Sequence, residues 1–252
     1  MKLLLENWRE FLKEGIDPRI QKQIDNLFAL PEVNLNPESA KPLPANVAVG
    51  IDLHGGSDQI TVFYCLIYKE SGKFVRRLSK EDSTKYISGY EEGTRKVEDT
   101  GIPYGNIIVY SPDEGERMIG APCLNGYSIA SAKATRGWGP LLYEVVLEWA
   151  SQEGRPGLMA DRRGVSDKAA AVWDKYLVRG DVDKKQLDID PAGAKQFHTQ
   201  QLTPDIPEDD CSQRSAARRG GSDGWQDTSI SKLYNKPNAE VMSALGARLV
   251  TI

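Results

Sequence analysis

The feature that most constrains the fold is a strand, a glycine-rich loop and an apolar helix that follow one another between residues 127 and 150. Spacing of apolar residues predicts a strand over Tyr127–Thr135. The loop Arg136-Gly137-Trp138-Gly139-Pro140 comes next, and its proline suits the first turn of a helix. Leu141–Ala150 is apolar enough for a buried helix. This order predicts an α/β protein.

A second strand and helix follow directly. Gly157–Asp161 is typical of a short buried strand. Ser166 is a suitable N-cap for a helix that carries an apolar face. Asp167 would lie in the first turn, where a negative charge is favourable for the helix dipole. We expect that face to contain Ala169, Val172, Trp173 and Tyr176.

Upstream of this unit, alternating apolar residues predict a hairpin. The first strand contains Val47, Val49, Ile51 and Leu53, a Gly-rich turn follows, and the second strand runs from Ile60 to Tyr68. Asn106–Tyr110 predicts another short strand. Together these segments predict a mixed sheet.

The ends of the chain have a different character. We expect an amphipathic leader helix over residues 1–14, then a helix and a Pro-rich linker over residues 15–45. The main domain is expected over residues 46–190. Residues 191–252 are expected to form a loop-rich C-terminal extension with one helical segment, Asn238–Ala247.

Composition excludes several classes of protein. The 40% hydrophobic and 27% charged residues are ordinary for a globular domain, and no apolar stretch is long enough to span a bilayer. A net charge of −4 argues against duplex nucleic acid as a partner. Three scattered cysteines and two histidines predict neither a disulfide framework nor a metal cluster, and we expect a reducing cytoplasm.

The glycine-rich loop offers the first functional hypothesis. A helix that begins after such a loop presents unpaired backbone N–H groups and the positive end of its dipole, which favour a phosphate. Gly137 and Gly139 allow close approach of the ligand. The alternative is a tight turn without a ligand.

Two segments resemble the core motifs of the GNAT superfamily of acyl-CoA N-acetyltransferases. Thr135–Leu142 resembles its Arg/Gln-x-x-Gly-x-Gly/Ala pyrophosphate loop, and Ser166–Trp173 resembles its Asn-x-x-Ala-x-x-aliphatic-Tyr segment. The resemblance implies a mixed-sheet GNAT-like fold that holds acetyl-CoA between two splayed central strands. It also implies that the amides of Arg136, Gly137, Trp138 and Gly139 bind the pyrophosphate.

Three positions depart from the family pattern. Ala134 stands where the motif has Arg or Gln, Pro140 lacks one of the N–H donors, and Trp173 replaces a tyrosine that protonates the departing thiolate. Tyr176 is the nearby phenol, so we expect it to be the acid. Asp161, or a water molecule, is the expected base.

The resemblance implies transfer of an acetyl group from acetyl-CoA to an amine, either on a small molecule or on a protein. The departures leave an alternative open, in which the protein is a non-catalytic phage virion or prohead-interior protein with a GNAT-like body. In that case the location would be the host cytoplasm or the virion.

The N-terminus carries a second resemblance. The helix that ends in Leu12-Lys13-Glu14 resembles the capsid-targeting leaders of tailed phages, which are cut after a Leu/Ile-x-Glu triplet. This implies a phage scaffold or capsid partner for residues 1–14. The alternative is a helix that packs on its own domain or on another partner.

Overall fold

The computed structural model describes residues 47–54, 59–67, 74–75, 105–112, 123–134, 137–212, 214 and 224–251. The leader over residues 1–14 and the helix and linker expected over residues 15–45 lie outside these ranges. They therefore stay predictions.

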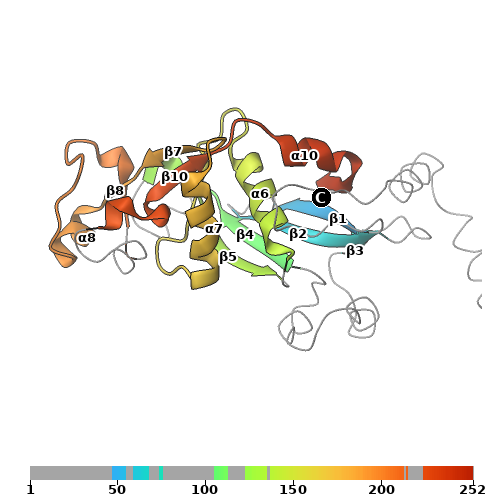
Figure 1. The fold of residues 1–252 in the computed structure, drawn as a ribbon, viewed down its shortest axis with the longest axis horizontal. Helices are drawn as coiled ribbons and strands as arrows, with labels where there is room; N and C mark the ends of the chain where they lie inside the picture. The colour runs from blue at the N-terminus through green and yellow to red at the C-terminus, as the bar shows by residue number, and fades with distance from the viewer. Residues whose placement is uncertain are drawn as a thin grey trace, which may run out of the picture.

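A mixed sheet of nine strands forms the centre of the described part (Figure 1). Eight strands lie side by side in the order β11-β1-β2-β4-β5-β6-β10-β7, and β3 pairs with β2. Their bounds are β1 Val47–Leu53, β2 Gln59–Ile67, β3 Phe74–Val75, β4 Gly105–Tyr110, β5 Tyr127–Ala134, β6 Leu158–Met159, β7 Asp183–Gln186, β10 Lys232–Asn235 and β11 Leu249–Thr251. The expected α/β class and mixed sheet are confirmed.

The hairpin of β1 and β2 follows the predicted alternation. The two strands are antiparallel, with Val47 opposite Leu66 and Leu53 opposite Ile60. Alternate residues such as Val49 point into the core. The alternation of apolar residues therefore determines the pairing register of the two strands. A shift of the pairing by one residue would turn the apolar side chains away from the core.

Two helices cover one face of the sheet. They are α6 (Gly139–Ala150) and α7 (Asp167–Val178), which lie next to each other in Figure 1. The N-cap of α7 is as predicted, because Ser166 Oγ accepts a hydrogen bond from Ala169 N at 3.3 Å. The buried position expected for Ala169 is taken by Ala170 instead.

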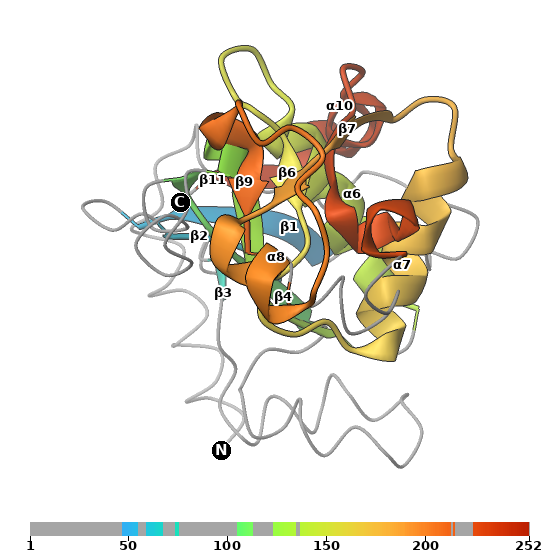
Figure 2. The same ribbon diagram turned by 90° about the vertical axis from the view of Figure 1, so that its left-hand side faces the viewer.

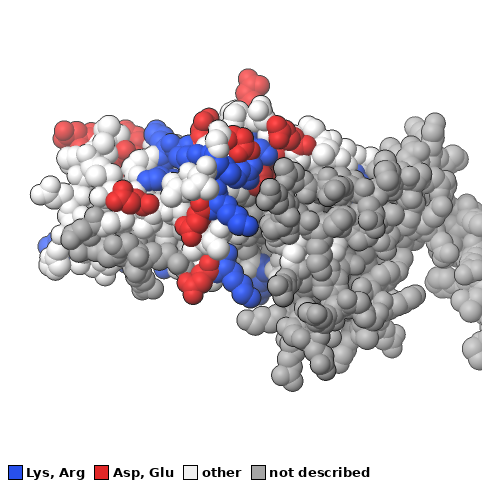
Figure 3. Space-filling model, in the orientation of Figure 1, with Lys and Arg blue, Asp and Glu red and all other residues white. Residues whose placement is uncertain are grey.

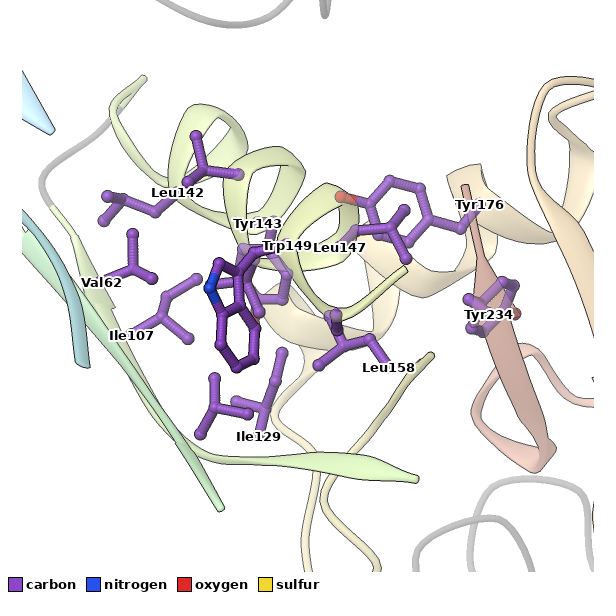
Figure 4. Packing of buried hydrophobic residues seen from close by; sticks show 14 of the residues in the cluster. Val62, Ile107, Ile129, Leu142, Tyr143, Leu147, Trp149, Leu158, Tyr176 and Tyr234 are labelled. Carbon is purple, nitrogen blue, oxygen red and sulfur yellow. The ribbon is translucent and has the colours of Figure 1, made fainter. Parts of the chain in front are cut away.

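The main core lies between these helices and the sheet. Figure 4 shows Trp149 of α6 beside Ile107 and Ile129, which come from adjacent strands. On the α7 side, the rings of Trp173 and Tyr234 stack with centroids 5.3 Å apart. Trp138, Trp149 and Trp173 are all buried.

A smaller buried cluster lies on the opposite face of the sheet. Along β6, Leu158 belongs to the main core, whereas its neighbour Met159 contacts a second buried cluster. Successive side chains of a strand point to opposite faces, so the second cluster lies across the sheet from α6. We call β8 (Asp188–Ile189), α8 (Pro191–Gln196) and β9 (Asp210–Cys211) the C-terminal layer; α8 and β9 are labelled in Figure 2. Cys211 belongs to the second cluster, whereas Ile189 and Ala194 belong to the main core.

Residues 191–252 contribute more than the expected loop-rich extension. β10 lies between β6 and β7, and β11 pairs in parallel with β1. Only Leu233 and Tyr234 of β10 are buried, and they are flanked by Lys232 and Asn235. Two apolar residues are too few to show an alternation, so this strand could not be predicted. The helix expected over Asn238–Ala247 is present as α10 (Glu240–Leu245).

The surface of the described part has mixed charge. In Figure 3, Lys and Arg side chains gather over the middle of the visible face, with Asp and Glu side chains beside them. Across the described ranges, no helix combines the length and the apolar character that crossing a membrane requires.

Candidate functional site

The candidate site is the place where two parallel central strands separate. β5 and β6 pair only through Tyr127 with Leu158 and Ser128 with Met159. β6 then ends, whereas β5 continues to Ala134. Beyond Ser128, the β6-facing edge of β5 therefore has no strand partner among the described strands. The backbone N–H and C=O groups on that edge therefore need partners other than a strand.

An irregularity in β5 lies at the point of separation. Ile108 of β4 is opposite Ser131, but Val109 is opposite Ile129, so Ala130 is an extra residue in β5. Such a bulge bends its strand and increases the local twist. It occurs two residues after the last β5–β6 pair, where β5 must turn away from β6.

The first turn of α6 lies near the end of β5, because Gly139 comes close to Ala134. Gly137 has φ 86°, a conformation that favours glycine, and Trp138 is the N-cap without a side-chain hydrogen bond. The N–H groups of Gly139 and Leu141 begin the helix, whereas Pro140 has none. These donors and the helix dipole can bind an anion. Arg136 lies outside the described residues.

Gly139 has room for a larger side chain. Among the described residues, a Cβ at this position would meet only the Ala134 Cβ, at an ordinary contact distance of 3.6 Å. Trp138, by contrast, is 3% exposed and packs in the core. Among the residues predicted to bind the pyrophosphate, Trp138 can therefore offer its backbone N–H to a ligand but not its indole ring.

Asp161 lies two residues after β6 ends, close to the point where the two strands separate. Its side chain is partly exposed, and its Oδ1 accepts a hydrogen bond from Arg163 N at 2.7 Å. A partly exposed carboxylate next to the separated strands can accept a proton. The position is compatible with the predicted base.

Tyr176 has a different environment. It is 3% exposed in α7, and its ring lies 5.7 Å from that of Trp173 and 5.9 Å from that of Tyr234. Figure 4 shows it packed against α6 near Leu147. Burial, and then the nearby Glu144 carboxylate, hold the pKa of Tyr176 well above its usual value. Burial and a raised pKa both disfavour a role as proton donor.

Arg162 is a residue of this region that the sequence did not single out. It is fully buried; its Nε donates to Ala160 O at 2.9 Å, and its Nη2 donates to Ile230 O. Burial lowers the pKa of its guanidinium to about 10, so it stays charged near neutral pH. Arg162 thus ties the chain after β6 to the segment before β10, away from β5. No local pattern predicts this role.

The cysteine expectation is wrong in one respect. Cys123 and Cys211 form a disulfide with their Cα atoms 4.7 Å apart, although 88 positions separate them. The spacing along the sequence could not reveal this pair, because only the fold brings β9 to the turn before β5. Disulfides persist mainly in oxidising environments, so this bond does not support the expected reducing compartment.

Three carboxylates form a cluster in the C-terminal layer. Oxygen atoms of Asp188, Asp209 and Asp210 lie within 4.8 Å of one another. Asp188 accepts hydrogen bonds from Leu202 N and Thr203 N, both at 2.8 Å. These bonds fasten a loop, which gives Asp188 a structural role.

Comparisons of the chain with protein-family models, with curated proteins and with solved structures found no match. The assignment of the site therefore depends on the geometry described above.

Proposed function

We propose that this protein binds acetyl-CoA in the gap between β5 and β6 and transfers the acetyl group to an amine. One observation carries the proposal: the pairing of the two central parallel strands ends at Ser128, and the N-terminus of α6 lies near the end of β5. The arrangement agrees with the GNAT-like fold that the resemblance implies. The proposal also agrees with the bulge at Ala130.

The pantetheine arm of acetyl-CoA is a chain of amide groups, and it would extend along the free edge of β5. Main-chain hydrogen bonds of this kind resemble the addition of a strand to a sheet edge. The pyrophosphate would then meet the first turn of α6, where Gly137 and Gly139 leave space and the helix dipole is favourable.

In the proposed reaction, the amine nitrogen attacks the thioester carbonyl carbon. A C–N bond forms, the C–S bond breaks, and CoA leaves as the thiolate. Asp161, or a water molecule, takes the proton of the amine. The thiolate receives a proton from solvent or from Tyr176, and the buried position of Tyr176 favours solvent.

The second candidate function is a non-catalytic phage virion or prohead-interior protein that keeps this fold. The observation in its favour is the burial of the two residues nearest the expected position of the proton donor. Trp173, which replaces the expected tyrosine, is 1% exposed, and Tyr176 is 3% exposed. A protein that binds CoA without turnover, or does not bind it, would fit this candidate.

Calorimetry with CoA and acetyl-CoA on the full chain tests the proposal. We expect saturable heat with both compounds, followed by release of free CoA when a panel of small amines and lysine peptides is added. An absence of heat at millimolar ligand would overturn the acetyl-CoA site. Binding without thiol release would support the non-catalytic candidate.

A further inference from the structure

The Cys123–Cys211 disulfide joins two segments that have different roles. Cys123 begins the turn Cys123–Asn125, which leads directly into β5. Cys211 belongs to β9, in the C-terminal layer. Both cysteines are buried, at 2% and 0% exposure. The bond therefore fastens the C-terminal layer to the start of one of the two separating strands.

The turn before β5 has an unusual backbone. Cys123, Leu124 and Asn125 have φ values of 43°, 55° and 53°, so three consecutive residues other than glycine are left-handed. L-residues disfavour this conformation, and it persists only when surrounding contacts enforce it. One enforcing contact is the disulfide at the first residue of the turn.

The bond also packs directly against the point of strand separation. Cys123 Sγ lies 3.3 Å from Met159 Sδ. Met159 is the partner of Ser128, in the last pair before β5 and β6 separate. Leu187 and Leu233 complete the buried cluster around these sulfur atoms. A change at the disulfide would therefore reach the apex of the candidate site through one side chain.

The other half of the bond is held by an ordered layer. Cys211 pairs with Ile189 of β8, and its carbonyl accepts a hydrogen bond from Asp190 N at 2.9 Å. Cutting the bond leaves Cys211 in this layer and removes its covalent link to Cys123. The left-handed turn is then the element free to relax.

We propose that the Cys123–Cys211 disulfide is a redox-sensitive clamp that holds the apex of the β5–β6 gap in its ligand-binding geometry. This inference rests on the proposed function and adds its regulation. A cellular dithiol reductant would transfer two electrons and two protons to the bond; the two cysteines become thiols and the dithiol becomes a disulfide. The turn then relaxes, β5 shifts against β6, and affinity for acetyl-CoA falls.

The test measures ligand affinity of the full-length protein in both redox states. The probe is dethio-CoA, because the thiol of CoA could itself exchange with the disulfide. Calorimetry is performed on the protein as purified under air and on protein treated with a phosphine reductant. A thiol count on denatured protein reports the state: we expect one free thiol, Cys65, before reduction and three after it.

We expect reduction to weaken dethio-CoA binding by more than about tenfold. Cys211→Ser should bind like the reduced wild type under both conditions, whereas Cys65→Ser should respond to reduction as the wild type does. Equal affinity in the two states would overturn the clamp, as would three free thiols in the air-exposed protein. Global unfolding on reduction, seen by circular dichroism, would overturn it too, because the bond would then hold the whole fold.

The same experiment separates this inference from the proposed function. If dethio-CoA binds equally well in both states, only the clamp fails. If neither state binds the ligand, the acetyl-CoA site fails and the clamp fails with it.

Discussion

Lys236 Nζ lies 2.6 Å from a carboxylate oxygen of Glu148, although 88 positions separate the two residues. Both side chains are buried, and Glu148 also accepts hydrogen bonds from Val241 N and Met242 N in the first turn of α10. A second carboxylate, Glu144, lies 3.2 Å from the same ammonium group. The pair therefore fastens the C-terminal segment to α6.

We predict that Lys236→Met lowers the free energy of unfolding by about 3 kcal/mol, because two buried carboxylates lose their shared cation. Urea denaturation of the full chain measures the change. Lys168→Met at an exposed position is the control and should stay within about 0.5 kcal/mol of the wild type. A loss no larger than that of the control would contradict a structural role for the pair.

The anion-binding role of the α6 N-terminus can be tested at Gly139. Gly139→Asp places a negative charge where the pyrophosphate would lie, and we expect the Kd for CoA to rise more than about tenfold. Gly139→Ala is the matched control, because a Cβ makes only an ordinary contact there. If both variants bind CoA as the wild type does, the phosphates do not lie at this helix.

The proton-transfer roles can be tested by steady-state kinetics once an acceptor amine is found. Asp161→Asn should lower kcat by about 10²–10⁴ with little change in KM, because a base acts in the transition state. Tyr176→Phe should lower kcat in the same manner if Tyr176 protonates the thiolate. Unchanged turnover in Tyr176→Phe would assign this step to solvent, the outcome that its burial favours.

The acidic cluster predicts a pH effect on stability. Burial, and then the charge of Asp188, raise the pKa of Asp210. Protonated Asp210 therefore stabilises the folded protein. This stabilisation is complete below the ordinary aspartate pKa of about 3.9, and it is lost as pH rises through the raised pKa of Asp210. Asp210→Asn should raise the melting temperature by a few degrees near neutral pH, and Asn can still accept the hydrogen bond from Gln201.

This gain should disappear when melting is measured below about pH 4, where Asp210 is protonated. Asp205→Asn, at an exposed position of the same region, is the control for removing one aspartate charge and should change the melting temperature little. A constant difference between Asp210→Asn and the wild type at all pH values would rule out charge as the cause.

The leader hypothesis can be tested by deleting residues 1–14. Its apolar stripe needs a surface, because a helix of about 14 residues is marginal alone in water. If that surface belongs to a phage scaffold or capsid partner, the melting temperature of the truncated protein should stay nearly unchanged. A drop of many degrees would show that the helix packs on its own domain, since each buried large apolar side chain contributes about 1.5–3 kcal/mol.

What the sequence by itself determined is local. Alternation over Val47–Leu53 predicted a hairpin strand, Ser166 predicted the start of α7, and the apolar run after Pro140 predicted α6. Each depends on residues close together in the chain, whose periodicity and capping follow from backbone geometry. The glycine-rich loop at the start of a helix was predictable for the same reason.

Only the tertiary structure decided the rest. The insertion of β10 between β6 and β7, the Cys123–Cys211 bond and the Lys236–Glu148 pair all join residues far apart in the chain. The bulge at Ala130 and the bond from Arg162 Nη2 to Ile230 O are of the same kind, since the first is defined by pairing with β4 and the second joins residues 68 positions apart. Such contacts form because the packed fold brings their partners together, and no local pattern encodes which distant residue will be the partner.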